Sequence, residues 1–179
     1  LLITRTPYRL SLYGGGLDYK DWYNTNKVKI LCAGLDYYCY QTVKNLPPFF
    51  NHKIRATYSK VETVNDAKEL EHPAIREVIL KYGNNLALEI SHIGDLPAKS
   101  GIGSSSSFTV GLINSISTLQ GKYIGKNELA IAAINLEQKE MQENVGIQDQ
   151  CAAAYGGLCL IKAYQDEIVA KRFICSSDY

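Results

Sequence analysis

The order of patterns along this 179-residue sequence predicts an α+β fold. The first part of the chain alternates apolar and polar residues and is rich in β-branched and aromatic side chains, which favours strands. Apolar residues at helical spacing then dominate the middle, and two strand-like segments follow them near the end. Because strands and helices occur in groups, without regular alternation, a doubly wound parallel sheet is disfavoured.

The expected strands form an early group and a late pair. Residues 2–13 mix Thr, Tyr, Leu and Ile, and the three glycines at 14–16 end this segment because glycine permits a sharp turn. The β-branched and aromatic run at 28–43 predicts one or two further strands. The remaining strands are expected over 54–61 and 86–93 and in the late segments LCLIKAY and EIVAKRFI, which a turn at Gln165 and Asp166 joins.

Helical spacing predicts three longer helices and one short helix. The segment PAIREVILK, residues 73–81, begins with a proline, which suits the first turn of a helix. Another helix is expected to begin near Phe108 and to end at Gly121, because apolar residues between them recur every three or four positions. The other two helices are expected over 126–142 and, in an alanine-rich segment, over 149–155.

Composition and charge narrow the classes of function. The net charge of +1, without long runs of one sign, gives no case for binding nucleic acid or an anionic membrane. The longest apolar runs are far shorter than the roughly 20 residues that a membrane helix needs. The five cysteines include no C-x-x-C pair, which is typical of reduced thiols, so a cytoplasmic protein is expected.

The segment DLPAKSGIGSSSSFTVGL, Asp95 to Leu112, is either a flexible linker or a phosphate-binding loop. Gly101 and Gly103 precede an amphipathic helix, whose first N–H groups and positive dipole end would attract phosphate. The serines at 104–107 add hydroxyls that could cap the helix, contact phosphate or bind Mg²⁺. A serine-capped helix without a ligand explains the same residues, so the local sequence leaves these readings open.

Three motifs carry a resemblance to a known family. PAKSGIGSSSS resembles the second motif of the GHMP small-molecule kinases, P-x-x-x-G-[LI]-G-S-S. TPYRLSLYGGGLDY, Thr6 to Tyr19, is similar to the sugar-contacting first motif of that family. ENVGIQDQCAAAYGG, Glu143 to Gly157, is similar to the segment that carries the catalytic Asp of the sugar kinases. The three motifs occur in the family's order, and the resemblance extends over nearly the whole chain.

The resemblance implies a ribosomal-protein-S5-domain-2-like α+β fold and ATP-dependent phosphorylation of a sugar. Residues 1–179 would form the N-terminal, ATP- and sugar-binding domain of a GHMP kinase. Family members are about twice as long, and their third glycine-rich motif is not found before Tyr179. We therefore expect the C-terminal domain to be absent from this chain, and the 179 residues alone to turn over poorly.

Within the family, the triple glycine, YSKVE at 58–62 and GIQDQCAAAYGG are most similar to a subgroup, the D-glycero-D-manno-heptose 7-phosphate kinases. That similarity implies transfer to the anomeric hydroxyl of the heptose 7-phosphate, which gives the 1,7-bisphosphate. Leu17, where the subgroup usually has Thr, and Lys99 and Ser100 in the serine-rich loop depart from its pattern. A galactokinase- or fucokinase-like sugar 1-kinase and a non-catalytic sugar or ATP sensor are the alternatives.

The resemblance also implies roles for individual residues. Asp149 would accept the hydrogen bond or the proton of the attacking hydroxyl, although the local pattern alone favours a cap for the short helix. Arg9 would stabilise the transferring phosphoryl group and contact substrate. Glu137, twelve residues before Asp149, is expected to bind Mg²⁺ together with Ser105.

The other expected contacts divide by ligand. ATP would lie against Pro97, Lys99, Gly101, Gly103, Ser104, Ser105 and Ser106, and the sugar or sugar phosphate against Gly15, Gly16, Asp18 and Tyr19 as well as Arg9. ATP and Mg²⁺ are therefore the expected cofactors. The sequence leaves a homodimer open.

Overall fold

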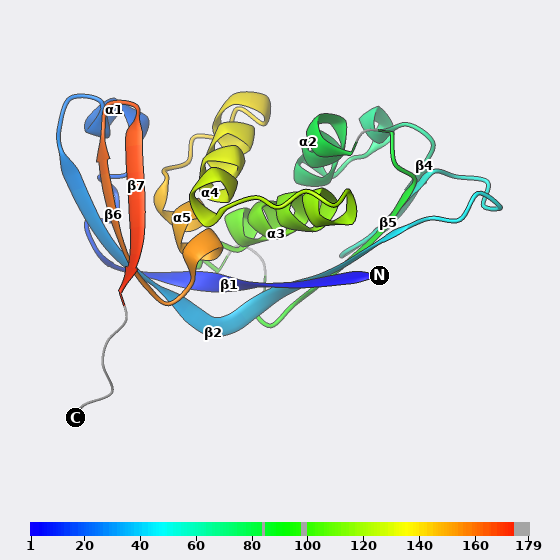
Figure 1. Ribbon diagram of the computed structural model, residues 1–179, viewed down its shortest axis with the longest axis horizontal. Coiled ribbons are helices and arrows are strands. Elements are labelled where there is room, and N and C mark those ends of the chain that lie inside the picture. The colour runs from blue at the N-terminus through cyan, green and yellow to red at the C-terminus, as the bar shows by residue number, and fades with distance from the viewer. Residues whose placement is uncertain (84, 98–99, 174–179) are drawn as a thin grey trace.

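One twisted sheet carries all four longer helices on the same face in the computed structural model of the chain, which describes residues 1–83, 85–97 and 100–173 (Figure 1). The strands are β1 (Leu2–Tyr13), β2 (Val28–Asn45), β3 (Ile54–Thr57), β4 (Val61–Val64), β5 (Leu88–Gly94), β6 (Leu158–Tyr164) and β7 (Glu167–Phe173). The longer helices are α2 (Pro73–Tyr82), α3 (Ser104–Leu119), α4 (Lys126–Asn135) and α5 (Gln148–Tyr155). Shorter turns are α1 (Lys20–Tyr23), a 3₁₀ turn Ala67–Glu69 and a π-helical turn Leu136–Glu140.

The long strand β2 organises the sheet. It pairs antiparallel with β1 from Leu2 opposite Val43 to Tyr13 opposite Leu31. Its two ends pair antiparallel with β5 and β6, so the strand order is β4-β3-β5-β2-β6-β7, with β1 pairing β2 off this path. Only β3 and β5 run parallel among the pairs that the structure describes. The grouped strands and helices confirm the α+β prediction.

Several element boundaries differ from the sequence-based expectation. The segment expected as one strand over 54–61 is two short antiparallel strands, β3 and β4, joined by a turn at Tyr58–Lys60. The helix expected over 126–142 leaves the α-helical pattern after Asn135 and continues as one π turn, in which Met141 N donates to Leu136 O at 2.9 Å. Such wide turns are rare and often occur at functional sites.

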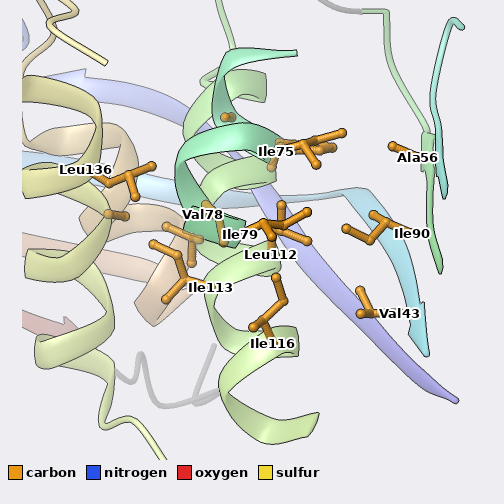
Figure 2. Packing of buried hydrophobic residues seen from close by; sticks show 14 of the residues in the cluster. Val43, Ala56, Ile75, Val78, Ile79, Ile90, Leu112, Ile113, Ile116 and Leu136 are labelled. Atoms are coloured by element: carbon orange, nitrogen blue, oxygen red, sulfur yellow. The ribbon is translucent and has the colours of Figure 1, made fainter. Parts of the chain in front are cut away.

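The central helix α3 is buried between the sheet and the other helices. In Figure 2, Leu112 and Ile116 of α3 lie on the side of the sheet residue Ile90. Ile113 lies on the side of Val78 of α2 and Leu136. A second cluster, which includes Ile30, Cys151 and Ile161, fills the space under α4 and α5. Packing on both sides fixes the N-terminal end of α3 against β1 and α5, and the candidate site lies there.

Two further observations bear on the class of protein. The four described cysteines, Cys32, Cys39, Cys151 and Cys159, are all free and buried, whereas Cys175 lies outside the described residues. Over the described part of the chain, no helix combines the length and the apolar character that crossing a membrane requires.

Candidate active site

Residues 100–103 of the serine-rich segment form a structured loop that leads into α3. Gly101 and Gly103 both take the left-handed conformation, with φ of 76° and 73°, which side chains other than glycine rarely adopt. Arg9 N donates to Ile102 O at 3.0 Å, and an Arg9 guanidinium nitrogen donates to Gly101 O at 2.9 Å. Because its backbone is held at two points, the part of this segment described from residue 100 onward is not a flexible linker.

The first turn of α3 leaves its N–H groups available. Gly103 occupies the N-cap position, and no side chain in the described residues caps the helix, so the serine-cap reading is wrong. Two serines point elsewhere instead: Ser106 Oγ donates to Glu137 and Ser107 Oγ donates to Pro7 O, each at 2.8 Å. A helix start with free N–H groups, next to a glycine loop, is suited to binding phosphate.

Arg9 and Asp149 form a bidentate ion pair beside this loop. Arg9 Nε donates to Asp149 Oδ1 at 2.5 Å, and Arg9 Nη2 donates to Oδ2 at 2.9 Å. Asp149 lies within the first turn of α5, whose N-cap is Ile147, so it does not cap that helix. A Cβ on Gly103 would lie 3.0 Å from Asp149 Oδ2, which shows how closely the loop approaches the carboxylate.

A cavity of about 470 Å³ opens beside the ion pair. Asp18 is 7% exposed there, and its carboxylate accepts hydrogen bonds from Gly16 N and Gln148 N, both at 3.2 Å. A Cβ on Gly146 would lie only 1.8 Å from Asp18 Oδ2, so this close approach requires glycine. The cavity is lined by Arg9, Ser11, Gly15, Gly16, Asp18, Tyr19, Val145, Gly146, Gln148, Asp149 and Gln150.

Glu137 is a fully buried carboxylate under the start of α3. Its Oε2 accepts hydrogen bonds from Ser106 Oγ at 2.8 Å and Gln150 Nε2 at 2.5 Å, whereas Oε1 has no partner in the described residues. Burial raises the pKa of Glu137, and the hydrogen bonds from Gln150 and Ser106 oppose that shift. The part of the chain that the structure describes contains no group of three acidic, His or Cys side chains placed to hold a metal.

The structure brings Ser106, and not the expected Ser105, to Glu137. Successive residues of an α-helix are rotated by about 100°, so only one of the two serines faces the buried carboxylate. Ser105 is exposed and lines a different cavity. The structure thus shows a direct hydrogen bond between Ser106 and Glu137, and the expected binding of Mg²⁺ by Ser105 and Glu137 stays a prediction.

That second cavity, of about 450 Å³, lies on the other side of the serine turn and is aromatic. Phe108 stacks on His72 and meets His92 edge-on, each with ring centroids 5.0 Å apart. Burial lowers the pKa of both histidines, which favours their neutral form at pH 7. Tyr8, Tyr58, Ser59, Leu96, Ser104 and Ser105 complete the lining.

Several of the expected site residues line one of the two cavities. Arg9, Gly15, Gly16, Asp18, Tyr19 and Asp149 line the first, and Ser104 and Ser105 line the second. Pro97 is exposed and its carbonyl accepts a hydrogen bond from Ser100 Oγ at 2.7 Å, and Lys99 lies outside the described residues. Sequence reasoning missed Ser11, Gln148 and Gln150 in the first cavity and the two histidines in the second.

The family is decided by a match to residues 65–157. This segment, more than half of the chain, fits the sequence model of the GHMP kinases N-terminal domain. The chain belongs to the GHMP kinases. The matched part of this GHMP kinase runs to Gly157 and contains the glycine loop, Glu137 and Asp149. The family resemblance read from the motifs is confirmed.

Relatives and solved structures agree with this assignment. A D-glycero-alpha-D-manno-heptose 7-phosphate kinase of Campylobacter jejuni is 28% identical over 175 residues, which cover 93% of this chain and 52% of the relative. This GHMP kinase chain therefore spans about half the length of that curated relative.

Two solved structures show the same fold. A D-glycero-D-manno-heptose 1-phosphate kinase from Bacteroides thetaiotaomicron matches with a TM-score of 0.86 at 24% identity, covering 98% of this chain and 61% of that structure. Lactococcus lactis galactokinase, solved with galactose, matches with a TM-score of 0.73 at 16% identity, covering 94% and 46%. These likenesses confirm the predicted GHMP kinase N-terminal fold.

Proposed function

We propose that this domain belongs to an ATP-dependent sugar kinase that phosphorylates the anomeric hydroxyl of D-glycero-D-manno-heptose 7-phosphate. The observation that carries the proposal is the Arg9–Asp149 ion pair, held between a phosphate-suited glycine loop and a cavity of about 470 Å³. Residues 1–179, which span about half the length of the curated relative, would form the ATP- and sugar-binding domain of such a kinase.

Asp149 would act on the hydroxyl of the acceptor. Asp149 lines the cavity, so a bound sugar hydroxyl could donate to its carboxylate and transfer its proton there as the sugar oxygen attacks the γ-phosphorus. The new O–P bond forms while the bond to the ADP oxygen breaks, and ADP leaves with the electron pair. Arg9, which also reaches Gly101 O, would keep the carboxylate oriented and stabilise charge on the transferring group.

The nucleotide would span the start of α3. Its phosphates fit the free N–H groups that follow Gly103, and its base fits the aromatic cavity formed around Phe108. Ser104 and Ser105 line that cavity at its junction with the helix start, so one ligand could occupy both places. His72 and His92, kept neutral by burial, offer ring faces and edges to a base.

Mg²⁺ fits the buried Glu137 and Ser106. The unpartnered Oε1 of Glu137 is an oxygen donor without a protein partner in the described residues, and hard cations prefer such ligands. When bound, the ion would neutralise charge on the β- and γ-phosphates. Gln150, which donates to Glu137 Oε2, would hold the carboxylate in place.

The choice of a heptose substrate rests on the Campylobacter jejuni relative, a heptose 7-phosphate kinase at 28% identity. A galactokinase-like sugar 1-kinase is the second candidate, supported by the structural likeness to Lactococcus lactis galactokinase at a TM-score of 0.73. Both would use the same carboxylate and the same loop, so the two candidates differ only in the sugar.

The test is ADP release by the full-length protein against a panel of sugars and sugar phosphates. We expect turnover with heptose 7-phosphate, and a loss of about 100-fold or more in kcat for Asp149→Asn while ATP still binds. The matched control is Glu143→Gln, a nearby acidic residue outside the cavity. Robust activity on galactose without activity on the heptose would refute the substrate, and unchanged kcat in Asp149→Asn would refute the role of Asp149.

A further inference from the structure

Gln148 is a buried amide side chain in the wall of the cavity beside Asp149. It is 3% exposed, and its Oε1 accepts a hydrogen bond from Ser11 Oγ at 2.9 Å. Its backbone N–H donates to Asp18 Oδ2 at 3.2 Å, which fixes the start of α5. Both the main chain and the oxygen end of this side chain are therefore held by the protein.

The nitrogen end of the amide is left free. Within the described residues, Nε2 of Gln148 donates to no protein acceptor. Ser11 Oγ acts as the donor to Oε1, and this assigns the two N–H groups to the other end of the amide. Gly15 closes over the pair, because a Cβ there would lie 2.5 Å from Ser11 Oγ and 3.8 Å from Oε1. Because Ser11 fixes the oxygen end, the free donors remain for a ligand in the cavity that Gln148 lines.

We propose that Gln148 is a specificity-determining residue whose Nε2 donates a hydrogen bond to a sugar oxygen next to the hydroxyl that is phosphorylated. This inference rests on the proposed function, since it takes the acceptor to be a sugar in this cavity. Asp149 follows Gln148 directly and accepts from the reacting hydroxyl, so the two side chains would contact neighbouring oxygens. A neutral donor matches an oxygen that can only accept, such as the ring oxygen, or a hydroxyl that can do both.

The energetic reason for selectivity is a donor on a buried side chain that has no acceptor among the residues described by the structure. A sugar that lacks the matching oxygen would leave Nε2 without a partner in the closed complex, which costs more than the hydrogen bond gains. Discrimination against such an analogue is expected to be about 10- to 100-fold in kcat/KM. A purely structural Gln148, which only anchors Ser11, would show no such selectivity.

Two variants separate these possibilities. Gln148→Glu keeps an acceptor for Ser11 Oγ but removes both N–H donors, and Gln148→Met removes the donors without adding charge. The full-length protein and both variants are assayed with the acceptor sugar, with its 2-deoxy analogue and with its carbocyclic analogue, in which a methylene replaces the ring oxygen. Thermal unfolding of each variant checks that the fold is retained.

If Gln148 contacts the sugar, the wild-type protein has a lower kcat/KM for one analogue than for the acceptor sugar. In both variants the ratio of kcat/KM for the sugar to kcat/KM for that analogue falls towards one. The analogue that shows the effect identifies the oxygen. If wild type and both variants discriminate equally, the inference is overturned while the sugar kinase function stands. If the wild-type protein neither binds nor phosphorylates any sugar, the proposed function is wrong, and the proposed role of Gln148 is wrong with it.

Discussion

The close contact between Gly146 and Asp18 allows a quantitative prediction about the wall of the cavity beside Asp149. In Gly146→Ala, the new Cβ would lie 1.8 Å from Asp18 Oδ2, whereas real contacts of this kind are not shorter than 3.0 Å, so the carboxylate has to retreat by about 1.2 Å. Both of its hydrogen bonds, from Gly16 N and Gln148 N, are already 3.2 Å long, and such a shift would break them.

The expected loss of stability follows from those two bonds. Hydrogen bonds to a charged group contribute about 1.5–3 kcal/mol each, and relaxation recovers part of this, so Gly146→Ala should lower the free energy of unfolding by about 2–4 kcal/mol. Urea denaturation measures this value in the wild type, in Gly146→Ala, in Asp18→Ala and in the double variant. In the Asp18→Ala background the clash is absent, so adding Gly146→Ala should cost less than about 1 kcal/mol.

A double-mutant cycle decides the outcome. A coupling energy of about 1–3 kcal/mol between the two positions would support the contact as described. Equal costs of Gly146→Ala with and without the Asp18 carboxylate would refute the reasoning, because the clash would then not be the cause of the loss.

Three further predictions concern the ion pair and the buried carboxylate. Arg9→Lys removes the bidentate pairing with Asp149, so kcat should fall by about 100-fold with little change in sugar affinity. Steady-state kinetics measures kcat, and calorimetry measures the affinity. An equal loss in kcat and in affinity would contradict a role of Arg9 in the transition state. Ser106→Ala removes a donor to Glu137, so it should destabilise the fold by about 1–3 kcal/mol and weaken Mg²⁺ activation. The matched Ser105→Ala should leave thermal stability unchanged, and equal effects of the two variants on stability would contradict the hydrogen bond between Ser106 and Glu137. Burial raises the pKa of Glu137, so the folded protein holds the proton of this carboxyl more tightly than the unfolded chain does. Without Mg²⁺, the free energy of unfolding therefore falls as the pH rises from the pKa of Glu137 in the unfolded chain to its pKa in the folded protein. Glu137→Gln should flatten this dependence in urea titrations across pH and abolish Mg²⁺ activation, and an unchanged slope would show that Glu137 is not its source.

Local patterns were sufficient for much of the fold. The expected helix over 73–81 is α2, Pro73–Tyr82, because its proline start and apolar spacing are properties of a short segment. The order of strands and helices likewise gave the α+β class. The three motifs gather at one place because β1, α3 and α5 pack together, and this brings Arg9, Gly103 and Asp149 into contact.

Two features of the candidate site could not be predicted from the sequence. One depends on helix boundaries to within a single residue, and the other depends on contacts between segments that are distant in the chain. Whether Ser105 or Ser106 faces Glu137 is set by the residue at which α3 begins and by the π turn after Asn135, and neither boundary is marked in the local pattern. His72 and His92 are far apart in the sequence, although both pack on Phe108. Only the tertiary arrangement of α2, β5 and α3 makes that cluster visible.

The central claim is that Asp149 and Arg9 serve phosphoryl transfer from ATP to a sugar's anomeric oxygen. Phosphorus NMR of the full-length protein with ATP, Mg²⁺ and heptose 7-phosphate tests it most directly. We predict one new phosphate resonance, coupled to the anomeric proton, that grows in step with ADP and is lost in Asp149→Asn. ADP formation without that resonance, or the same resonance at full rate in Asp149→Asn, would contradict the account.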